Sequence, residues 1–228
     1  MPNNEDLKLC MISGSFEYDS EESLTIFQDY IEKNCAVKST MIIYQSEDDD
    51  QSLEPLENTD VLLVFTRRLN TSGKELERFK TYCAQGKSIV GVRTASHAFQ
   101  NWLDFDKEVL GGNYQGHYGS GPLVHLEIAP EAKEHPILQG VSDFKSHGSL
   151  YENTPLAADT SLLLTGKTDE PKAEGVGERS EHSEPVAWTR LHRGGRIFYT
   201  SLGQQKDFKD ENFLHLLANA VFWVAGRL

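Results

Sequence analysis

The chain has 228 residues, and its 35 aspartates and glutamates outnumber its 22 lysines and arginines, which gives a formal net charge of −13. Nucleic acids and anionic membranes are bound through lysine and arginine side chains that neutralise phosphate groups. The charge balance therefore argues against both as partners. The length suits one α/β domain over residues 1–228, with a core large enough to fold without disulfide bonds.

Three cysteines, Cys10, Cys35 and Cys83, are too few for a disulfide framework or a zinc ribbon. Cys10 and Cys83 stand in apolar patterns typical of small buried side chains, so we expect free thiols and a reducing compartment. No basic region precedes an apolar stretch of signal-peptide length, and no apolar run is long enough to span a membrane. These features predict a cytoplasmic protein.

Strand and helix patterns alternate along the first hundred residues. Apolar runs at 7–12, 37–44, 60–65 and 88–92 predict buried strands, and helical spacing of apolar residues predicts one helix from residue 20 and another that ends at Gly86. Such alternation favours a parallel sheet with right-handed crossovers. We expect a three-layer, doubly wound, mostly parallel α/β fold of the flavodoxin-like type.

The pattern is less regular after residue 105. A glycine-rich, aromatic loop is predicted over 111–119, an alternating strand over 122–128, and a mobile surface loop over the polar stretch 166–184. The segments 185–191 and 195–202 flank two glycines and predict an added C-terminal β-hairpin. A last amphipathic helix is predicted from Glu211.

Candidate site residues follow from a rule for parallel sheets, in which ligands bind beyond the carboxyl ends of the strands. Residues 67–68, 93–97 and 201–207 each follow an apolar strand. The second of these, within SIVGVRTASHAF, predicts a strand, a sharp turn at Arg93 and then a helix. In many α/β enzymes such a turn holds the nucleophile, but an arginine stays protonated and cannot attack a substrate.

Four segments, in the same order, resemble the ThuA-like (trehalose-utilization) family: VGVRTASHAF, LGGNYQGHYG, HPILQGV, and GGRIFYTSLGQQKDF with the helix that follows it. The resemblance runs from about residue 60 to the C-terminus. It implies the fold of the class I glutamine amidotransferases. It also implies a role in the catabolism of trehalose-type disaccharides or their 3-keto derivatives.

The resemblance also indicates what Arg93 replaces. Glutamine amidotransferases carry Gly-x-Cys-x-Gly at the equivalent turn, with the cysteine as nucleophile, whereas this chain has arginine there, so glutaminase activity is not expected. An arginine beside a helix N-terminus offers five N–H donors to a carboxylate, an enolate or sugar oxygens. The alternative is that Arg93 pairs with a nearby carboxylate and only braces the turn.

Two histidines are candidates for proton transfer. His97 would lie about one helical turn after Arg93, and His117 lies in the glycine-rich loop. Each could act as general acid or base, although a partly buried structural histidine is the alternative for His97. The spacing of the histidines matches no zinc motif. No cofactor is therefore expected, and a divalent metal is compatible with the sequence but has no support from ligand spacing.

Polar and aromatic side chains near the same strand ends are predicted to hold the sugar. They are Arg67, Thr94, Asn113, Tyr114, Tyr118, Ser201, Gln204 and Asp207. Gln204 departs from the resemblance, because many members of the family have histidine after this glycine, and glutamine cannot exchange a proton. The His-x-Glu pair of the amidotransferases is also missing from this segment.

Two functional hypotheses stay open. In the first, the protein is an enzyme in which Arg93 and Arg67 polarise a sugar oxygen and His97 or His117 moves a proton. In the second, it is a non-catalytic sugar-binding or regulatory module that has kept the fold. Both predict a small carbohydrate as partner. A homo-oligomer, in which a second subunit completes the glycine-rich loops, is compatible with either hypothesis.

Overall fold

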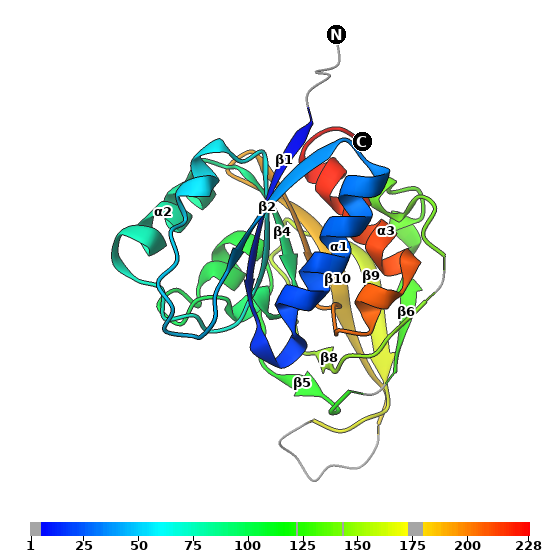
Figure 1. Ribbon diagram of the computed structural model, residues 1–228. Helices are drawn as coiled ribbons and strands as arrows, with labels where there is room; N and C mark the ends of the chain where they lie inside the picture. Colours follow the sequence, from blue (N-terminus) through cyan, green and yellow to red (C-terminus); the bar gives the residue numbers. More distant parts are fainter. Residues whose placement is uncertain (1–5, 122, 143, 173–179) are drawn as a thin grey trace.

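A nine-stranded sheet forms the centre of the molecule (Figure 1). The computed structural model describes residues 6–121, 123–142, 144–172 and 180–228. Within these ranges the strands of the sheet lie in the order β2-β1-β3-β4-β11-β10-β9-β6-β7. The order brings the last strand of the chain, β11, next to β4, so segments about one hundred residues apart contribute neighbouring strand ends.

One half of the sheet is parallel. It consists of β1 (Leu7–Gly14), β2 (Val37–Ile43), β3 (Val61–Thr66), β4 (Ser88–Val92) and β11 (Gly195–Thr200). β1 pairs with β2 and β3, β3 with β4, and β4 with β11. Every residue of β3 is buried, because a strand that is covered on both faces has no solvent side on which polar residues could alternate. The four strands predicted in the first hundred residues are confirmed.

The other half of the sheet is antiparallel, so the sheet is mixed. It consists of β10 (His182–His192), β9 (Ser161–Thr168), β6 (Val124–Ile128) and β7 (Lys145–Ser146). The predicted strands of the hairpin pair with each other, but β11 also pairs with β4 and so joins the two halves of the sheet. The prediction of a loop over 166–184 is wrong at both ends, which belong to β9 and β10. Residues 173–179 lie outside the described residues.

Helices cover both faces of the parallel half. α1 (Ser20–Asn34) and α3 (Glu211–Val224) lie on one face, and α2 (Gly73–Ala84) lies on the other (Figure 1). Phe27 and Phe213 belong to the core cluster on the first face and Phe79 to the cluster on the second, all at 0% exposure. Burying a side chain of this size contributes about 1.5–3 kcal/mol. No helix in the described ranges is long and apolar enough to cross a membrane.

The helix predicted after Arg93 is absent, which corrects one expectation. The residues Arg93–His97 form a short 3-10 turn, and a π-helical turn follows at Asp106–Leu110. The loop after β3 explains the early end of the turn, because the backbone N–H groups of Arg68 and Leu69 donate to the carbonyls of His97 and Ala98. Those carbonyls would otherwise accept the next bonds of an α-helix. Arg93 therefore does not stand beside a helix N-terminus.

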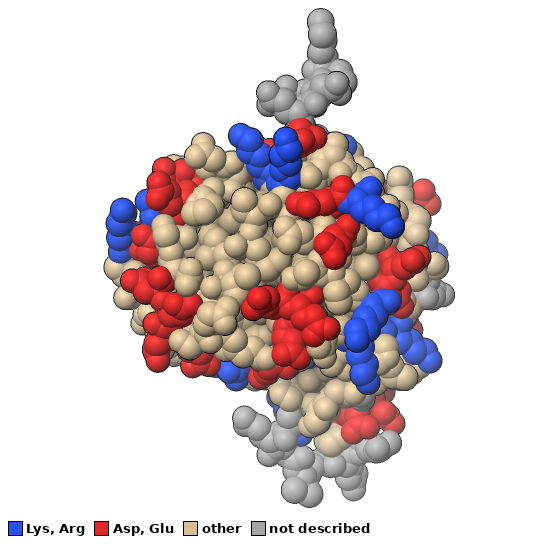
Figure 2. Space-filling model, in the orientation of Figure 1, with Lys and Arg blue, Asp and Glu red and all other residues tan. Residues whose placement is uncertain are grey.

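A small second sheet lies beyond the carboxyl ends of the parallel strands (Figure 1). It pairs β5 (His117–Tyr118) with β8 (Leu150–Tyr151). On the face seen in Figure 2, acidic side chains gather in several groups among residues that are mostly neither acidic nor basic. The second sheet covers the sheet edge at which the strand-end residues meet, and that edge holds the candidate site.

Candidate functional site

The turn after β4 is held in an unusual backbone conformation. Arg93 has a φ of 47°, a left-handed value that is uncommon for any residue other than glycine. The Tyr199 hydroxyl donates to the Arg93 carbonyl at 2.7 Å. A Cβ at Gly91 would lie 2.9 Å from the Tyr199 ring, so this strand position needs glycine. The geometry is that of a sharp strand-to-turn elbow, with arginine in the place of a nucleophile.

The side chain of Arg93 turns inward from this elbow. It is 1% exposed, and its guanidinium lies between the rings of Tyr18 and Tyr151, at 4.4 and 4.7 Å from their centroids. Nη1 donates to the Ser201 carbonyl at 2.8 Å and Nη2 to the Tyr18 hydroxyl at 3.2 Å. The guanidinium is thus withdrawn from open solvent, and the two aromatic faces offset part of the lost hydration. Among the described residues no carboxylate forms an ion pair with it, so a simple brace is not seen either.

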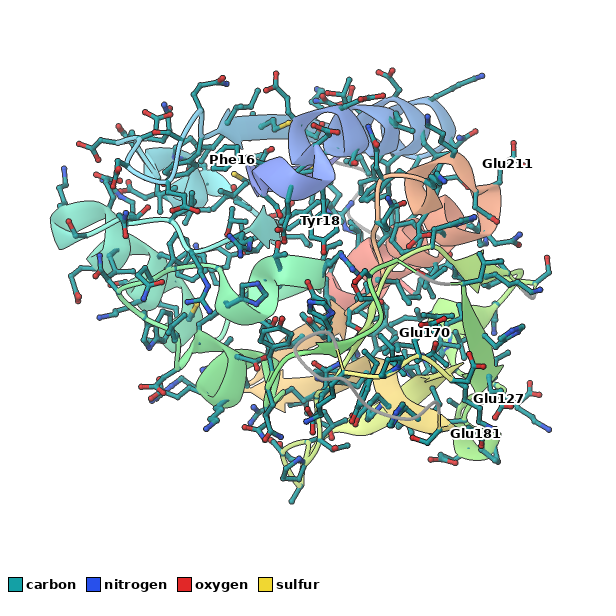
Figure 3. All side chains as sticks on the ribbon, turned by 90° about the horizontal axis from the view of Figure 1, so that it is seen from below. Phe16, Tyr18, Glu127, Glu170, Glu181 and Glu211 are labelled. Carbon is teal, nitrogen blue, oxygen red and sulfur yellow. The ribbon has the colours of Figure 1, made fainter. Side chains whose placement is uncertain are left out.

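One cavity opens directly beside this arginine, and we call it the elbow cavity. It has a volume of about 290 Å³ and is lined by Tyr18, Arg93, Ser120, Gly121, Leu123, His147, Gly148, Ser149, Gln204 and Lys206. Figure 3 looks onto this end of the molecule and places Tyr18 near its middle, below the short helix that carries Phe16. Of the predicted site residues, Arg93 and Gln204 line this cavity.

A histidine that the sequence analysis did not select completes the elbow cavity. His147 Nδ1 lies 3.4 Å from Oδ1 of Asp207, and the imidazole is 41% exposed while the Asp207 side chain is 0% exposed. A ring whose Nδ1 faces a buried carboxylate has its Nε2 on the opposite side and available for proton transfer. The two residues are 60 positions apart, so no local spacing could have identified the pair.

The Asp207 carboxylate is held by donors on every side. Oδ2 accepts from the Ser146 hydroxyl and from the backbone N–H groups of Gly203 and Gln204, at 2.6, 3.0 and 3.1 Å. Oδ1 accepts from the backbone N–H of His147 at 2.9 Å. Asp207 was predicted to bind substrate directly, but the structure places it behind His147, where it positions the imidazole and the segment around Gln204.

A second cavity, which we call the histidine cavity, lies on the other side of the Arg93–His97 turn. Its volume is about 210 Å³, and it is lined by Arg68, Ser96, His97, Leu103, Asp104, Asp106, Lys107 and Tyr114. His97 stacks on Tyr114 with centroids 4.6 Å apart, and Tyr114 contacts Tyr151 at 4.7 Å. Tyr151 in turn covers Arg93. Stacked aromatic rings thus separate His97 from the predicted partner Arg93.

Burial and neighbouring charge decide the protonation of His97. Its burial, and then the positive charges of Arg68 and Arg67, lower the pKa of His97 from 6.5 to about 3. The imidazole is therefore neutral at physiological pH, with the Ser96 hydroxyl 3.0 Å from Nδ1. A neutral histidine can donate or accept a hydrogen bond in this cavity.

Asp106 is a second residue that the sequence analysis did not identify. It is 4% exposed, and burial raises its pKa from 3.8 to about 6. Oδ2 accepts from the backbone N–H of Tyr114 at 2.8 Å, whereas Oδ1 has no hydrogen-bond partner among the described residues. A carboxyl with one donor and little water is expected to titrate close to neutrality.

The remaining predicted residues of the glycine-rich loop lie outside both cavities. His117 Nδ1 contacts the Gly119 carbonyl at 2.9 Å. Asn113 donates to the Thr154 carbonyl at 3.0 Å, and Tyr118 stacks on His182 with centroids 3.9 Å apart. These contacts shape the loop and the second sheet. Tyr114 is the residue of this loop that reaches a cavity wall.

Three further predicted residues are occupied by contacts of their own. Thr94 is fully buried and donates to the Ser15 hydroxyl at 2.9 Å. Ser201 is buried and contributes its backbone carbonyl to Arg93. Arg67 forms exposed ion pairs with Glu17 and Glu47, at 3.2 and 3.7 Å. The structure therefore divides the predicted site into an elbow group, a histidine group and supporting residues.

Two larger hollows, of about 430 and 600 Å³, lie away from the carboxyl ends of the parallel strands. The first adjoins α2 and Lys87, and the second includes Arg193 in the turn before β11. The strand-end rule favours the two smaller cavities as ligand sites. In the described ranges, no group of three or more histidine, cysteine, aspartate or glutamate side chains is placed to hold a metal ion.

Comparison with solved structures places the fold among known proteins. A ThuA-like protein from Bacteroides uniformis is 21% identical with a TM-score of 0.71, and the alignment covers 98% of this chain and 94% of that one. A ThuA-like protein from Parabacteroides merdae is 17% identical with a TM-score of 0.71, covering 97% and 90%. A glutamine amidotransferase from Methylobacillus flagellatus is 9% identical with a TM-score of 0.52, covering 98% and 95%. These likenesses show a shared fold.

A family model supplies the closer assignment. No match was found among curated proteins. The model of the ThuA family, described as trehalose utilisation, matches residues 10–224. The description supports a general carbohydrate-related role, and it agrees with the resemblance of the four segments. Because the match covers nearly the whole chain, the protein belongs to the ThuA family.

Proposed function

We propose that the protein is an enzyme of carbohydrate metabolism that uses the elbow cavity for acid–base chemistry on a sugar. The observation that carries this proposal is the pair of His147 and Asp207, because it points a backed imidazole into the same cavity as Arg93. The cavity lies at the strand ends where ligands of open α/β sheets bind. Its volume is near the lower end for small-molecule sites, which suits one sugar ring.

The roles of the residues follow from their atoms. Asp207 accepts from Nδ1–H of His147 and leaves Nε2 to take a proton from, or return it to, a sugar carbon or oxygen. Arg93 stabilises negative charge that develops on the neighbouring sugar oxygen. Gln204 supplies polar contact at the rim. Its Oε1 accepts from the Lys206 backbone N–H at 2.7 Å, so its orientation is defined.

Glutaminase activity forms no part of this proposal. Arg93 stands at the elbow, and the thiols of Cys10 and Cys83 are buried elsewhere, where burial raises the pKa of Cys10 to about 11 and that of Cys83 above its ordinary value. A thiol nucleophile needs a lowered pKa and access to its substrate. The cytoplasmic location and the homo-oligomer remain predictions.

The test is turnover of trehalose-type disaccharides and their 3-keto derivatives, followed by NMR of the sugar products. Replacing the base through His147→Gln should lower turnover about 100-fold or more while substrate binding is retained. His125→Gln is the matched control, because His125 is exposed on β6 and lines neither cavity. Equal turnover in the wild type and in His147→Gln would remove His147 from the mechanism.

A non-catalytic sugar-binding or regulatory module is the second candidate. It is favoured by Gln204, which stands where many members of the family are expected to have a proton-exchanging histidine. This candidate predicts that sugars bind in the elbow cavity without any chemical change, whether or not divalent metals are added. Calorimetric titration beside the NMR assay separates the two candidates.

A further inference from the structure

The elbow cavity is basic although the chain as a whole is acidic. Arg93, Lys206 and His147 contribute to its wall, and none of its described lining residues is an aspartate or glutamate. With 35 acidic residues against 22 lysines and arginines in the chain, a wall without carboxylates is a local reversal of charge. In Figure 3, Glu127 and Glu181 lie toward the side of the antiparallel strands, away from Tyr18.

Arg93 brings to this wall a positive charge with which no described carboxylate pairs directly. An arginine has five N–H donors, and the described contacts of Arg93 use one on Nη1 and one on Nη2. Nε is buried and has no partner among the described residues. A buried cation without a paired anion is costly to a folded protein. The two tyrosine faces offset this cost only in part, at about 0.5–2 kcal/mol each.

The buried acid Asp207 favours the charged form of Arg93 through space and so raises its pKa, but it forms no ion pair with the guanidinium. Asp207 already accepts from the donors of Ser146, His147, Gly203 and Gln204, and its side chain is completely buried behind His147. Lys206 is exposed at the rim, and no described carboxylate forms an ion pair with it. The charges that face the cavity are therefore positive and free to meet a ligand.

We infer that the sugar bound in the elbow cavity carries an anionic group, a carboxylate or a phosphate, which is paired with Arg93 and Lys206. A charge-assisted bond from arginine to such a group is about twice as strong as a neutral hydrogen bond. The anionic group of the ligand then supplies the direct ion pair that no described carboxylate of the protein makes with Arg93 or Lys206. This inference rests on the proposed function, because it names the class of sugar that the same cavity takes.

The experiment compares sugars that share the glucose ring and differ in the group at C6, by calorimetric titration of the full chain at low salt. D-glucuronate, with a carboxylate, and glucose 6-phosphate, with a phosphate, are set against neutral D-glucose. We expect at least one of the two anionic sugars to bind about tenfold more tightly than glucose, and to lose much of that advantage in high salt. The two anionic arms show which acid group fits.

Lys206→Met should weaken binding of the anionic sugar about threefold to fivefold, and by more than it weakens binding of glucose. Lys209→Met is the matched control. Lys209 lies three positions after Lys206, is exposed and lines neither cavity, so the variant removes the same charge outside the site. An equal effect of both variants would indicate a general field and would overturn the inference.

The remaining outcomes separate the inference from the proposed function. If glucose and the anionic sugars bind equally, the inference fails and the sugar site stands. If acetate or inorganic phosphate alone binds as tightly as the anionic sugars, the cavity recognises a free anion and the inference fails. If neither neutral nor anionic sugars bind, the proposed carbohydrate site fails with it.

Discussion

A buried aspartate is associated with each cavity: Asp106 lines the histidine cavity, and Asp207 lies behind His147 of the elbow cavity. The two carboxyls are held in opposite ways. Asp207 beside the elbow cavity is surrounded by backbone and hydroxyl donors, whereas Asp106 in the histidine cavity has one donor and an oxygen without a partner. The arrangement around Asp106 raises the pKa of that carboxyl, whereas the donors around Asp207 fix the position of its carboxyl oxygens.

The other buried ionisable side chains of the two cavities, Arg93 and His97, also differ in charge. The elbow cavity keeps a guanidinium that cannot lose its charge, while the histidine cavity has a neutral His97 and a carboxyl whose pKa burial raises to about 6. One cavity therefore keeps a permanent positive charge in its wall. The other lowers the cost of burial by keeping His97 neutral, and its Asp106 loses its charge only below about pH 6.

Asp207→Ala tests the first half of this comparison with the largest expected effect. The substitution leaves the N–H groups of Gly203 and Gln204 and the Ser146 hydroxyl without their acceptor. We expect a loss of about 3–5 kcal/mol in the free energy of unfolding, as for a broken buried ionic network. Urea denaturation measures it, and Asp207→Asn, which keeps one acceptor oxygen, should lose less. A loss below about 1 kcal/mol for the alanine variant contradicts the role given to Asp207.

Gly148→Ala tests whether stability and sugar binding depend on the position of the Arg93 guanidinium. A Cβ at position 148 would lie 2.5 Å from Nη1 of Arg93, so the guanidinium would have to leave its place between Tyr18 and Tyr151. Overpacking of this kind costs about 1–3 kcal/mol. We expect a lower melting temperature and weaker sugar binding. Ser149→Ala, at the neighbouring position, should change stability by less than about 0.5 kcal/mol. Unchanged binding in Gly148→Ala would mean that the position of Arg93 does not matter.

Asp106→Asn tests the raised pKa of the carboxyl in the histidine cavity through the pH dependence of stability. The pKa of Asp106 is raised from 3.8 to about 6 in the folded state, so the folded protein takes up a proton that the unfolded chain does not as pH falls from 6 toward 4. Burial of Asp106 thus costs stability above pH 6, and that cost disappears toward pH 4. We expect Asp106→Asn to be about 2 kcal/mol more stable than wild type near pH 8 and equal to it near pH 4.

The measurement for Asp106 is urea denaturation of both proteins across this pH range. His97 titrates with the opposite sign, because its pKa is lowered to about 3 and stability from its burial is lost as pH falls below 6.5. Both proteins contain His97, so its contribution cancels when the free energy of unfolding of the wild type is subtracted from that of the variant at each pH. Asp104→Asn is the control, since Asp104 is exposed on the same cavity wall. A stability difference that does not change with pH would show that the pKa of Asp106 is not raised in the folded state.

The sequence was sufficient for the elements whose signal is local. The continuous apolar run of β3 and the alternation of strand and helix patterns predicted the parallel half of the sheet and the turn at Arg93. The direction of the Arg93 side chain was not predictable, because Tyr18 and Tyr151 come from segments that carry no periodic signal. The helix after Arg93 was predicted wrongly for a related reason, since distant backbone donors from the loop after β3 take its carbonyls.

The candidate site was predictable only in part for the same physical reason. Arg93 and Gln204 were identified because strand ends mark the edge where ligands bind, and both line the elbow cavity. His147 reaches that cavity from a short strand connection and owes its role to Asp207, which lies 60 positions away. A burial pattern cannot reveal such a pair before the topology is known. Asp106 was likewise hidden in a segment without helical or strand periodicity.

Arg67→Ala gives the smallest expected effect and tests whether the ligand site ends at the elbow cavity. Arg67 was predicted to polarise a sugar oxygen, yet it lines neither cavity, and its partners Glu17 and Glu47 are themselves 45% and 48% exposed. Exposed ion pairs contribute about 0.2–1 kcal/mol, because water screens the charges and both side chains lose freedom. We expect about 0.5 kcal/mol of lost stability and unchanged affinity for sugars, measured by denaturation and calorimetric titration. A tenfold loss of sugar affinity would extend the ligand site beyond the elbow cavity to the end of β3. It would also show that Arg67 contributes to ligand binding in addition to Arg93 and Lys206.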